Sequence, residues 1–568
     1  MCVITHRFFA LFVLCHALGM LLLHALEISP GQTVKGSVEG NQTNVYTFSA
    51  ASGDAIRALA VRTGGSVSTV VGLRIVAPDG GSLGADSRSE DAVAYVESVR
   101  LARSGVYEVR VWNTLSVQSF DYELGLIKTT GLNQVDSDGS GGVITVGETK
   151  TGRIESPADL DTYTFTASAN DTIKVLAVKT ALSSGSVVGL HVLAPDGSVL
   201  GSDARSEDAV AYFDALRLPQ SGSYQLVIWN IPFPGTLVVS QKFDYAVTLN
   251  KSSGNNRIDS DGSGGPILPG ETKNGRIESP TDMDAYAFAA AAGDTIKVLA
   301  VMRTSSSAAV IGLQVVAPDG SVLGVDARTE DAVAYFDALR LPQSGNYQLL
   351  IWNFPFPGAL FLNQTYDYTL SLLKMPGPNV GDPEGGPIGP EETRTGTISL
   401  GDLDAFEFDG LPCQNVEVRV ISRTTGAGPI TLELRDSDGS LLSSSSGSVG
   451  ATSRFYGLPK LGKYLVTIRS TDGRRAFDYD LNLHLFPLPP KPEIGGGGPQ
   501  LFITSCTNET IVFWPASAVG FGLESTLQLN SPILWSEVAG TSAVVGEWSF
   551  SSHPKPSTQE YFRLREKP

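Results

Sequence analysis

The chain has 568 residues, of which 42% are hydrophobic and 18% are charged, and its formal net charge is −18. This hydrophobic content excludes a globally disordered chain, and the length predicts several domains. The acidic balance argues against nucleic acid and anionic membranes as partners, and it is compatible with cation binding.

The first 26 residues have the pattern of a targeting segment. His6 and Arg7 precede an apolar run from Phe8 to Leu26. A short basic start before such a run predicts a secretory signal peptide over 1–26, with an uncleaved anchor as the alternative. We therefore expect a secreted or cell-surface protein with no membrane span after signal removal.

Repeats of domain size follow the signal. "APDG" occurs at 77–80, 194–197 and 317–320. Four tyrosines that follow a Gly-x step are spaced by 117, 123 and 117 residues, namely Tyr107, Tyr224, Tyr347 and Tyr464. A period this long indicates whole domains in tandem. Each copy contains short alternating segments such as "DTYTFTA" between turn signals, which is typical of a β-sandwich.

The sequence thus predicts an all-β chain: four tandem jelly-roll-like β-sandwiches followed by a small β-sandwich module. In chain order the predicted segments are a signal peptide (1–26), sandwich one (27–128), an acidic Gly-rich linker (129–145), sandwich two (146–250), a second acidic Gly-rich linker (251–268), sandwich three (269–374), a linker (375–389), a divergent sandwich four (390–486), a Pro/Gly linker (487–500) and a C-terminal β module (501–568). Cys413 and Cys506 fall in different predicted domains, so the sequence indicates no disulfide framework.

Several marks resemble a known family. The stretch "GETKTGRIESPADLDTYTFTA", the Pro-Asp-Gly turn and the Ser-Gly-x-Tyr start of a strand resemble the bacterial pre-peptidase C-terminal domain. The resemblance covers about 29–486. It implies jelly-roll-like sandwiches of the kind found on secreted hydrolases and surface proteins. The stretch "VFWPASAVGFGLESTLQL" is similar to a small fibronectin-like C-terminal module of some bacterial secreted proteins.

The acidic linkers raise the question of calcium. "VDSDGSGGVI" at 135–144 returns as "IDSDGSGGPI" at 258–267. An EF-hand loop that starts at Asp136 would need a carboxylate at its twelfth position, but Gly147 stands there. No helix is predicted beside the loop either. An EF-hand is therefore disfavoured.

A different calcium site remains possible, because acids recur in pairs downstream of the linkers. Alternate residues of a strand share one face, so such a pair can converge with linker acids on one ion. The candidate calcium ligands are Asp136, Asp138, Asp159, Asp161, Asp259, Asp261, Asp282, Asp284, Asp382, Glu384, Asp402 and Asp404. Sandwich one has no acidic linker and carries Gln42 and Asn44 at the strand pair. The resemblance adds that some family members bind calcium near this linker. The alternative interpretation is a solvated turn and hinge.

Aromatic residues near Pro-bounded loops are candidate ligand contacts. They are Trp229, Phe233, Trp352 and Phe356. Exposed aromatics on sandwich loops can bind glycans or proteins, and they can equally fold onto the sandwich edge.

Catalytic motifs are not evident. The histidines beyond the signal, His191, His484 and His553, are scattered and form no metal-ligand motif. We expect a non-enzymatic, secreted structural and interaction protein, monomeric, with calcium-stiffened joints, that binds an extracellular polysaccharide or protein. The alternatives are a binding accessory of a separate secreted hydrolase and an enzyme of unrecognised type.

Overall fold

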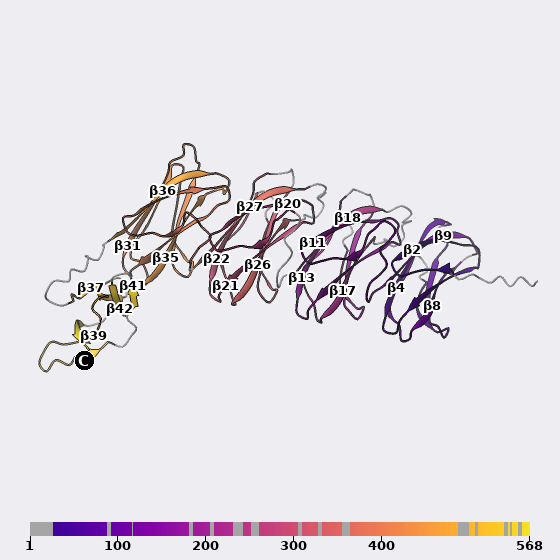
Figure 1. The fold of residues 1–568 in the computed structure, drawn as a ribbon, viewed down its shortest axis with the longest axis horizontal. Coiled ribbons are helices and arrows are strands. Elements are labelled where there is room, and N and C mark those ends of the chain that lie inside the picture. Colours follow the sequence, from indigo (N-terminus) through magenta and orange to yellow (C-terminus); the bar gives the residue numbers. More distant parts are fainter. Residues whose placement is uncertain are drawn as a thin grey trace, which may run out of the picture.

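Four two-sheet sandwiches follow one another along the chain, and a smaller module ends it (Figure 1). This confirms the predicted all-β fold class. The computed structural model describes residues 26–66, 68–87, 92–115, 117–180, 186–204, 209–230, 242–251, 261–304, 309–327, 332–354, 364–375, 377–486, 499–505, 509–538, 543–545, 548–554 and 559–567. Among them there is no helix with the length and hydropathy of a membrane span.

The first sandwich pairs a five-stranded sheet, β1-β3-β8-β5-β6, with a four-stranded sheet, β2-β9-β4-β7. Its strands are β1 (Leu26–Glu27), β2 (Gln32–Val38), β3 (Thr43–Ala50), β4 (Ala55–Gly65), β5 (Val71–Val76), β6 (Ser82–Asp86), β7 (Val93–Arg100), β8 (Gly105–Asn113) and β9 (Phe120–Lys128). The short edge strand β1 runs parallel to β3.

The second sandwich repeats this topology with sheets β10-β12-β17-β14-β15 and β11-β18-β13-β16. Its strands are β10 (Gly142–Val143), β11 (Glu148–Ile154), β12 (Leu160–Ala167), β13 (Thr172–Lys179), β14 (Val188–Leu193), β15 (Val199–Ala204), β16 (Val210–Arg217), β17 (Gly222–Asn230) and β18 (Phe243–Lys251).

The third sandwich has sheets β19-β21-β26-β23-β24 and β20-β27-β22-β25. Its strands are β19 (Gly265–Pro266), β20 (Thr272–Ile277), β21 (Met283–Ala290), β22 (Thr295–Met302), β23 (Ile311–Val316), β24 (Val322–Ala327), β25 (Val333–Arg340), β26 (Gly345–Asn353) and β27 (Tyr366–Met375).

The fourth sandwich has sheets β28-β30-β35-β32-β33 and β29-β36-β31-β34. Its strands are β28 (Gly386–Pro387), β29 (Thr393–Ile398), β30 (Asp404–Gly410), β31 (Asn415–Ser422), β32 (Ile430–Arg435), β33 (Leu441–Gly447), β34 (Gly450–Phe455), β35 (Gly462–Ser470) and β36 (Phe477–Phe486).

The C-terminal module has sheets β37-β38-β42-β41 and β40-β39-β43. Its strands are β37 (Phe502–Ser505), β38 (Glu509–Pro515), β39 (Phe521–Thr526), β40 (Ser536–Glu537), β41 (Ala543–Val545), β42 (Trp548–Pro554) and β43 (Tyr561–Glu566). Ile511, Trp548 and Phe550 of this module pack against Leu411 and Cys413 of the fourth sandwich. Cys413 is disulfide-bonded, to a cysteine outside the described residues, which corrects the expectation of no disulfide.

The tyrosines that mark the repeat lie in the sandwich cores. Each begins the inward face of a central strand, and its hydroxyl donates to the backbone carbonyl four residues earlier. Tyr107 also stacks on Phe48 with a centroid distance of 5.6 Å. The hydroxyl therefore has a partner although the ring is buried, as a buried phenol requires.

Successive sandwiches also stack on one another, as the row in Figure 1 shows. The four-stranded sheet of each sandwich packs against the five-stranded sheet of the next. Three further apolar clusters fill these joints: Leu59, Val61 and Ile127 with Ala158, Leu160, Leu193 and Val227; Leu176, Val178 and Val210 with Met283, Val316, Leu350 and Trp352; and Leu299, Val301, Leu373 and Met375 with Leu403, Ala405 and Leu465. At the first joint a Cβ on Gly125 would lie 2.0 Å from the Ala158 carbonyl oxygen, so the backbones approach as closely as only glycine permits.

Candidate metal centre and the joints between sandwiches

The acidic linker is drawn onto the second sandwich by a short parallel strand. β10 pairs with β12, with Gly142 opposite Tyr163 and Val143 opposite Thr164. Gly141 has a φ of +93°, and a Cβ there would lie 2.9 Å from the Thr162 carbonyl oxygen. The linker thus runs along the strand that carries the predicted acid pair, and β19 and β28 repeat this arrangement.

Three carboxylates meet where the linker reaches β12. Asp136, Asp159 and Asp161 each place one oxygen so that all three atoms lie within 4.8 Å of one another. Asp159 is 2% exposed and Asp161 is 1% exposed. Asp161 Oδ2 accepts a hydrogen bond of 2.7 Å from the Tyr245 hydroxyl. Its Oδ1 is buried and accepts no hydrogen bond from the described residues.

This arrangement strongly disfavours charge in the absence of a cation. Burial and the repulsion from Asp136 raise the pKa of Asp159 to about 8. Burial and the neighbouring Asp159 raise the pKa of Asp161 well above its usual range. Such shifts mark a site that either holds protons or holds a positive ion.

The fourth sandwich has an equivalent group of Asp382, Glu384 and Asp404. Asp382 accepts hydrogen bonds from the backbone amides of Gly385 and Ala405, at 2.7 and 2.8 Å. Burial raises the pKa of Asp382 to about 6 despite these bonds. Asp404 accepts a hydrogen bond from the Tyr479 hydroxyl, which repeats the pairing of Asp161 with Tyr245.

In the third sandwich Asp282 and Asp284 are buried, and the Tyr368 hydroxyl donates to Asp284 Oδ2 at 2.5 Å. Asp261 lies in the preceding turn, where its Oδ1 accepts from the Ser263 amide at 2.7 Å. Asp259 lies outside the described residues. The strand pair is thus placed as in the second sandwich.

Asp138 and Asp402 are held by hydrogen bonds beside the three-carboxylate groups. Asp138 Oδ1 accepts from the Ser140 amide at 2.7 Å and shapes the linker turn. Asp402 Oδ1 accepts from the Thr272 hydroxyl of the third sandwich at 2.6 Å, so this side chain bridges the joint. Neither belongs to the three-carboxylate group beside it.

In the first sandwich, Asn44 stands at the position that Asp161 occupies in the second. Asn44 Nδ2 donates to the Tyr122 hydroxyl at 2.9 Å, where Asp161 accepts from Tyr245. The Tyr122 hydroxyl thus has a hydrogen-bond partner without a carboxylate, because the Asn44 amide nitrogen donates to it.

The carboxylate groups fit a hard cation. Ca²⁺ takes six to eight oxygen ligands, and each group offers three carboxylates. Asp161 Oδ1 is buried and has no hydrogen-bond partner among the described residues. This oxygen is therefore the ligand atom that such an ion would bind. The residues therefore fit calcium, and a bound ion would fix the linker to the strand.

Cavities adjoin two of the joints. A cavity of about 470 Å³ between the first two sandwiches includes Asp136 and Asp159 in its lining, together with Gln32, Thr33, Gln134 and Ser156. A cavity of about 530 Å³ between the third and fourth sandwiches includes Glu384, Thr272, Asn274 and Ser399. Both linings are rich in hydroxyl and amide groups beside the acids.

Each joint also buries a cation, which sequence reasoning missed. Arg57 Nη1 lies 2.8 Å from Nδ1 of His191 in the next sandwich. Burial and the adjacent guanidinium lower the pKa of His191 to about 3, so the neutral ring accepts the bond. Lys174 in the second joint donates to Gln314 Oε1 at 2.9 Å, and its ammonium lies 3.8 Å from the centroid of Trp352.

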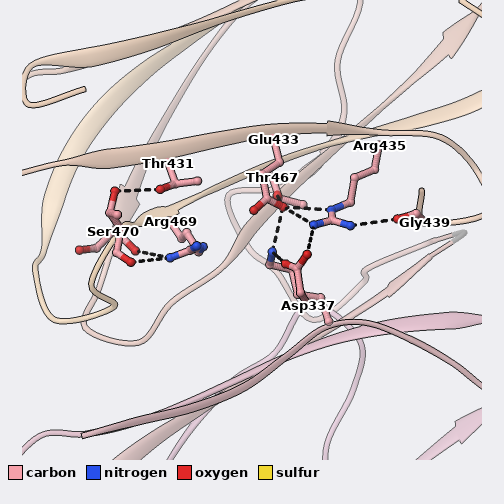
Figure 2. A network of polar contacts seen from close by, with 10 residues as sticks. Asp337, Thr431, Glu433, Arg435, Gly439, Thr467, Arg469 and Ser470 are labelled. Atoms are coloured by element: carbon pink, nitrogen blue, oxygen red, sulfur yellow. Dashed lines mark hydrogen bonds and ion pairs between the residues drawn. The ribbon is translucent and has the colours of Figure 1, made fainter. Parts of the chain in front are cut away.

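The third joint holds a larger charge network (Figure 2). Lys297 Nζ donates to Asp337 in its own sandwich and, at 2.8 Å, to Glu433 Oε2 in the next. Figure 2 shows Asp337 below Arg435. The Arg435 guanidinium donates hydrogen bonds to Asp337, to Glu433 and to the Gly439 carbonyl. Every charge in this network has an opposite partner, as burial demands.

The two tryptophans of the candidate aromatic site lie in joints between sandwiches. Trp352 is 2% exposed and packs in the second joint, in line with the alternative that these aromatics fold onto the sandwich. Trp229 is half-buried in the first joint, 5.2 Å from the ring of His191. Phe233 and Phe356 lie outside the described residues.

Comparisons with known proteins give a likeness of fold. No protein-family model and no curated protein matches the chain. The pre-peptidase C-terminal domain of a Bacillus anthracis collagenase shares 21% identity, with 18% of this chain and 94% of that domain covered and a TM-score of 0.16. Aeromonas hydrophila PliG, a periplasmic inhibitor of g-type lysozyme, shares 16% identity, with 20% and 96% covered and a TM-score of 0.16. The CUB1-EGF-CUB2 fragment of human MASP-1/3 shares 13% identity, with 39% and 99% covered and a TM-score of 0.12. Values this low carry no argument about function.

Proposed function

We propose that the protein is a secreted or cell-surface, non-catalytic spacer for extracellular binding or adhesion, stiffened by calcium at its linkers. The observation that carries this proposal is the stacking of each sandwich on the next, because three apolar joints with buried polar partners restrict bending. A flexible string of domains would not bury leucines between its units.

Calcium has a defined place in this proposal. The ion would neutralise Asp136, Asp159 and Asp161 and would tie the linker to β12. The same would hold for Asp382, Glu384 and Asp404 beside the fourth sandwich. Loss of calcium should loosen the linkers and leave the sandwich cores folded, since the cores contain their own apolar clusters.

Small-angle X-ray scattering of the full chain, with calcium and with a chelator, tests both parts. In calcium we expect a maximum particle dimension that equals the length of a straight row of sandwiches. After chelation we expect a broader distribution of interatomic distances. A broad distribution under both conditions would refute the stiff spacer. A narrow distribution that chelation does not change would keep the spacer and remove the role of calcium.

A second candidate is a binding accessory of a separate secreted hydrolase. It is favoured by the two joint cavities, whose hydroxyl and amide linings suit a polysaccharide or an extended peptide. Retention of the full chain on immobilised polysaccharides or collagen tests it. Thr33→Trp, which would fill the first cavity, should reduce retention. The matched control is Asp79→Asn in the exposed turn of the first sandwich, which is not part of the cavity lining and should leave retention unchanged.

A further inference from the structure

The two outermost sheets of the stack differ from the sheets inside it. The five-stranded sheet of the first sandwich and the four-stranded sheet of the fourth have no sandwich stacked on their outer faces among the described residues. At several matching positions these two sheets carry charged side chains where the covered sheets carry uncharged ones.

The outer face of the first sandwich is charged where inner faces are not. Arg110 is the third residue after Tyr107, and the same position after Tyr224 and Tyr347 holds Val227 and Leu350. Both of the latter belong to joint clusters. Arg110 instead pairs with Glu108 on its own strand, with Nη2 2.6 Å from Oε2.

Arg74 completes this charged face. It precedes the Pro-Asp-Gly turn at the position that holds the joint acceptors His191, Gln314 and Glu433 in the other sandwiches. Its guanidinium lies 5.3 Å from the centroid of Trp112. An arginine cannot accept a hydrogen bond, so the acceptor of the joint is replaced by a donor.

The outer face of the fourth sandwich is altered at the matching positions. Arg419 stands where Leu59, Leu176 and Leu299 fill the joints. Glu417 stands two residues earlier, where Arg57, Lys174 and Lys297 supply the joint cation. Glu417 Oε2 is held by Arg454 of the neighbouring strand at 2.6 Å.

Stacking one copy on another would bring these two faces together. Glu417 and Arg74 have opposite signs, so this pair alone would tolerate the contact. Arg419 and Arg110 would both enter a part of the contact that is apolar in the first two joints, where two guanidinium groups would lose water without gaining a partner. The apolar surface of the inner joints is reduced on both sides: the first sandwich keeps Val76 and Trp112 at joint positions, and the fourth keeps Ile421.

We propose that the first and fourth sandwiches are end caps of the stack, and that the charges on their outer faces prevent head-to-tail stacking of copies and so fix the length at four sandwiches. Repeat arrays need polar outer faces on their terminal units to stay soluble. The inner joints use the same sheets with apolar residues and a cation bound to an acceptor. The difference between cap and joint therefore lies in a few side chains.

Face grafting in the full chain tests the proposal. One variant receives the inner face of sandwich two on sandwich one: Thr43→Leu, Arg74→His, Glu108→Gln and Arg110→Val. The other receives the joint face of sandwich one on sandwich four: Glu417→Arg, Arg419→Leu, Arg454→Glu and His484→Ile. Sedimentation velocity gives the mass of each variant alone and of the equimolar mixture.

We expect the wild-type chain and each variant alone to sediment as monomers, and the mixture to form a species of twice the monomer mass. A mixture that stays monomeric while circular dichroism shows both variants folded would overturn the proposal, as would head-to-tail association of the wild-type chain. Should either graft fail to fold, Arg110→Val and Arg419→Leu are tested alone, and their mixture must then self-associate more strongly than wild type.

Discussion

Lys297 in the third sandwich and Glu433 in the fourth form an ion pair across their joint, with Nζ 2.8 Å from Oε2 and both side chains buried. The lysine belongs to a strand of one folding unit, and its counter-ion belongs to the next unit. The buried ion pair therefore makes the folded state of one sandwich depend on the presence of the next.

Removing Lys297 should destabilise this joint more than the rest of the chain. Lys297→Met leaves Glu433 buried with Arg435 as its remaining cation. We expect a loss of about 3 kcal/mol, since breaking a buried pair costs more than its net attraction. Urea unfolding with hydrogen exchange resolved to β22 and β32 measures it. The matched control is Lys463→Met: Lys463 and its partner Asp409 are 57% and 48% exposed, so their pair is solvated and the change should be below about 1 kcal/mol.

Acid should weaken the same joint. Although burial opposes it, Lys297 and Arg435 lower the pKa of Asp337 to about 2. A carboxyl whose pKa is lower in the folded state contributes stability above its unfolded pKa of about 4. That contribution is lost as the pH falls through about 2. Thermal unfolding between pH 5 and pH 2 should therefore show a decline that Lys297→Met reduces; an unchanged decline would contradict the assignment.

The calcium groups should respond to pH in the opposite direction. The folded-state pKa of Asp159 is about 8, which lies above its unfolded value, so without calcium the folded site is favoured at low pH and disfavoured as the pH rises through about 8. Calcium must then displace protons at neutral pH. Calorimetric titrations at pH 7 in buffers of different ionisation enthalpy should show proton release, and calcium affinity should increase from pH 6 to pH 9. Heat that is independent of the buffer would count against the site.

Asp161→Asn should convert the second sandwich toward the first. The new amide can donate to Tyr245 as Asn44 donates to Tyr122. We expect calcium binding at this group to be lost and, in chelator, an unfolding free energy higher by about 1–3 kcal/mol, because a buried carboxyl that Asp159 repels when charged is replaced by a neutral amide. Asp79→Asn, an exposed acid of the first sandwich, should change neither quantity. A calcium affinity that survives Asp161→Asn would place the ion elsewhere.

Trp352 should contribute chiefly to the second joint. Trp352→Ala removes the ring beneath the Lys174 ammonium and is expected to cost about 3–5 kcal/mol. Trp112→Ala, at the matching position on the uncovered face of the first sandwich, should cost clearly less. Hydrogen exchange in β13 and β26 would localise the loss. Equal costs for the two tryptophans would argue that the joint adds nothing to their stability.

The sequence predicted the sandwiches well because their signals are local. Alternation in "DTYTFTA" and the turn at "APDG" specify strands and hairpins without knowledge of neighbours. The convergence of Asp159 and Asp161 also follows from strand periodicity. The joints escaped prediction because they depend on which sheet the next unit covers. One signal was present: β13, "TIKVLAVK", is buried along its whole length, and a strand apolar on both faces indicates cover on both sides. Lys174 interrupts that apolar pattern, and the sequence alone would place it on the surface. In the structure its ammonium lies over the ring of Trp352.

The two inner sandwiches present matching faces at both ends, with Lys174 and Lys297 on one side and His191 and Gln314 on the other. Deleting sandwich two would bring Arg57 opposite Gln314, and the guanidinium could again donate a hydrogen bond to an acceptor across the joint. Gene duplication or loss of a middle unit would thus change the length in whole steps while every new junction stays compatible. The row can grow or shrink only from its interior, so related chains of three or five units would need no redesign of their ends.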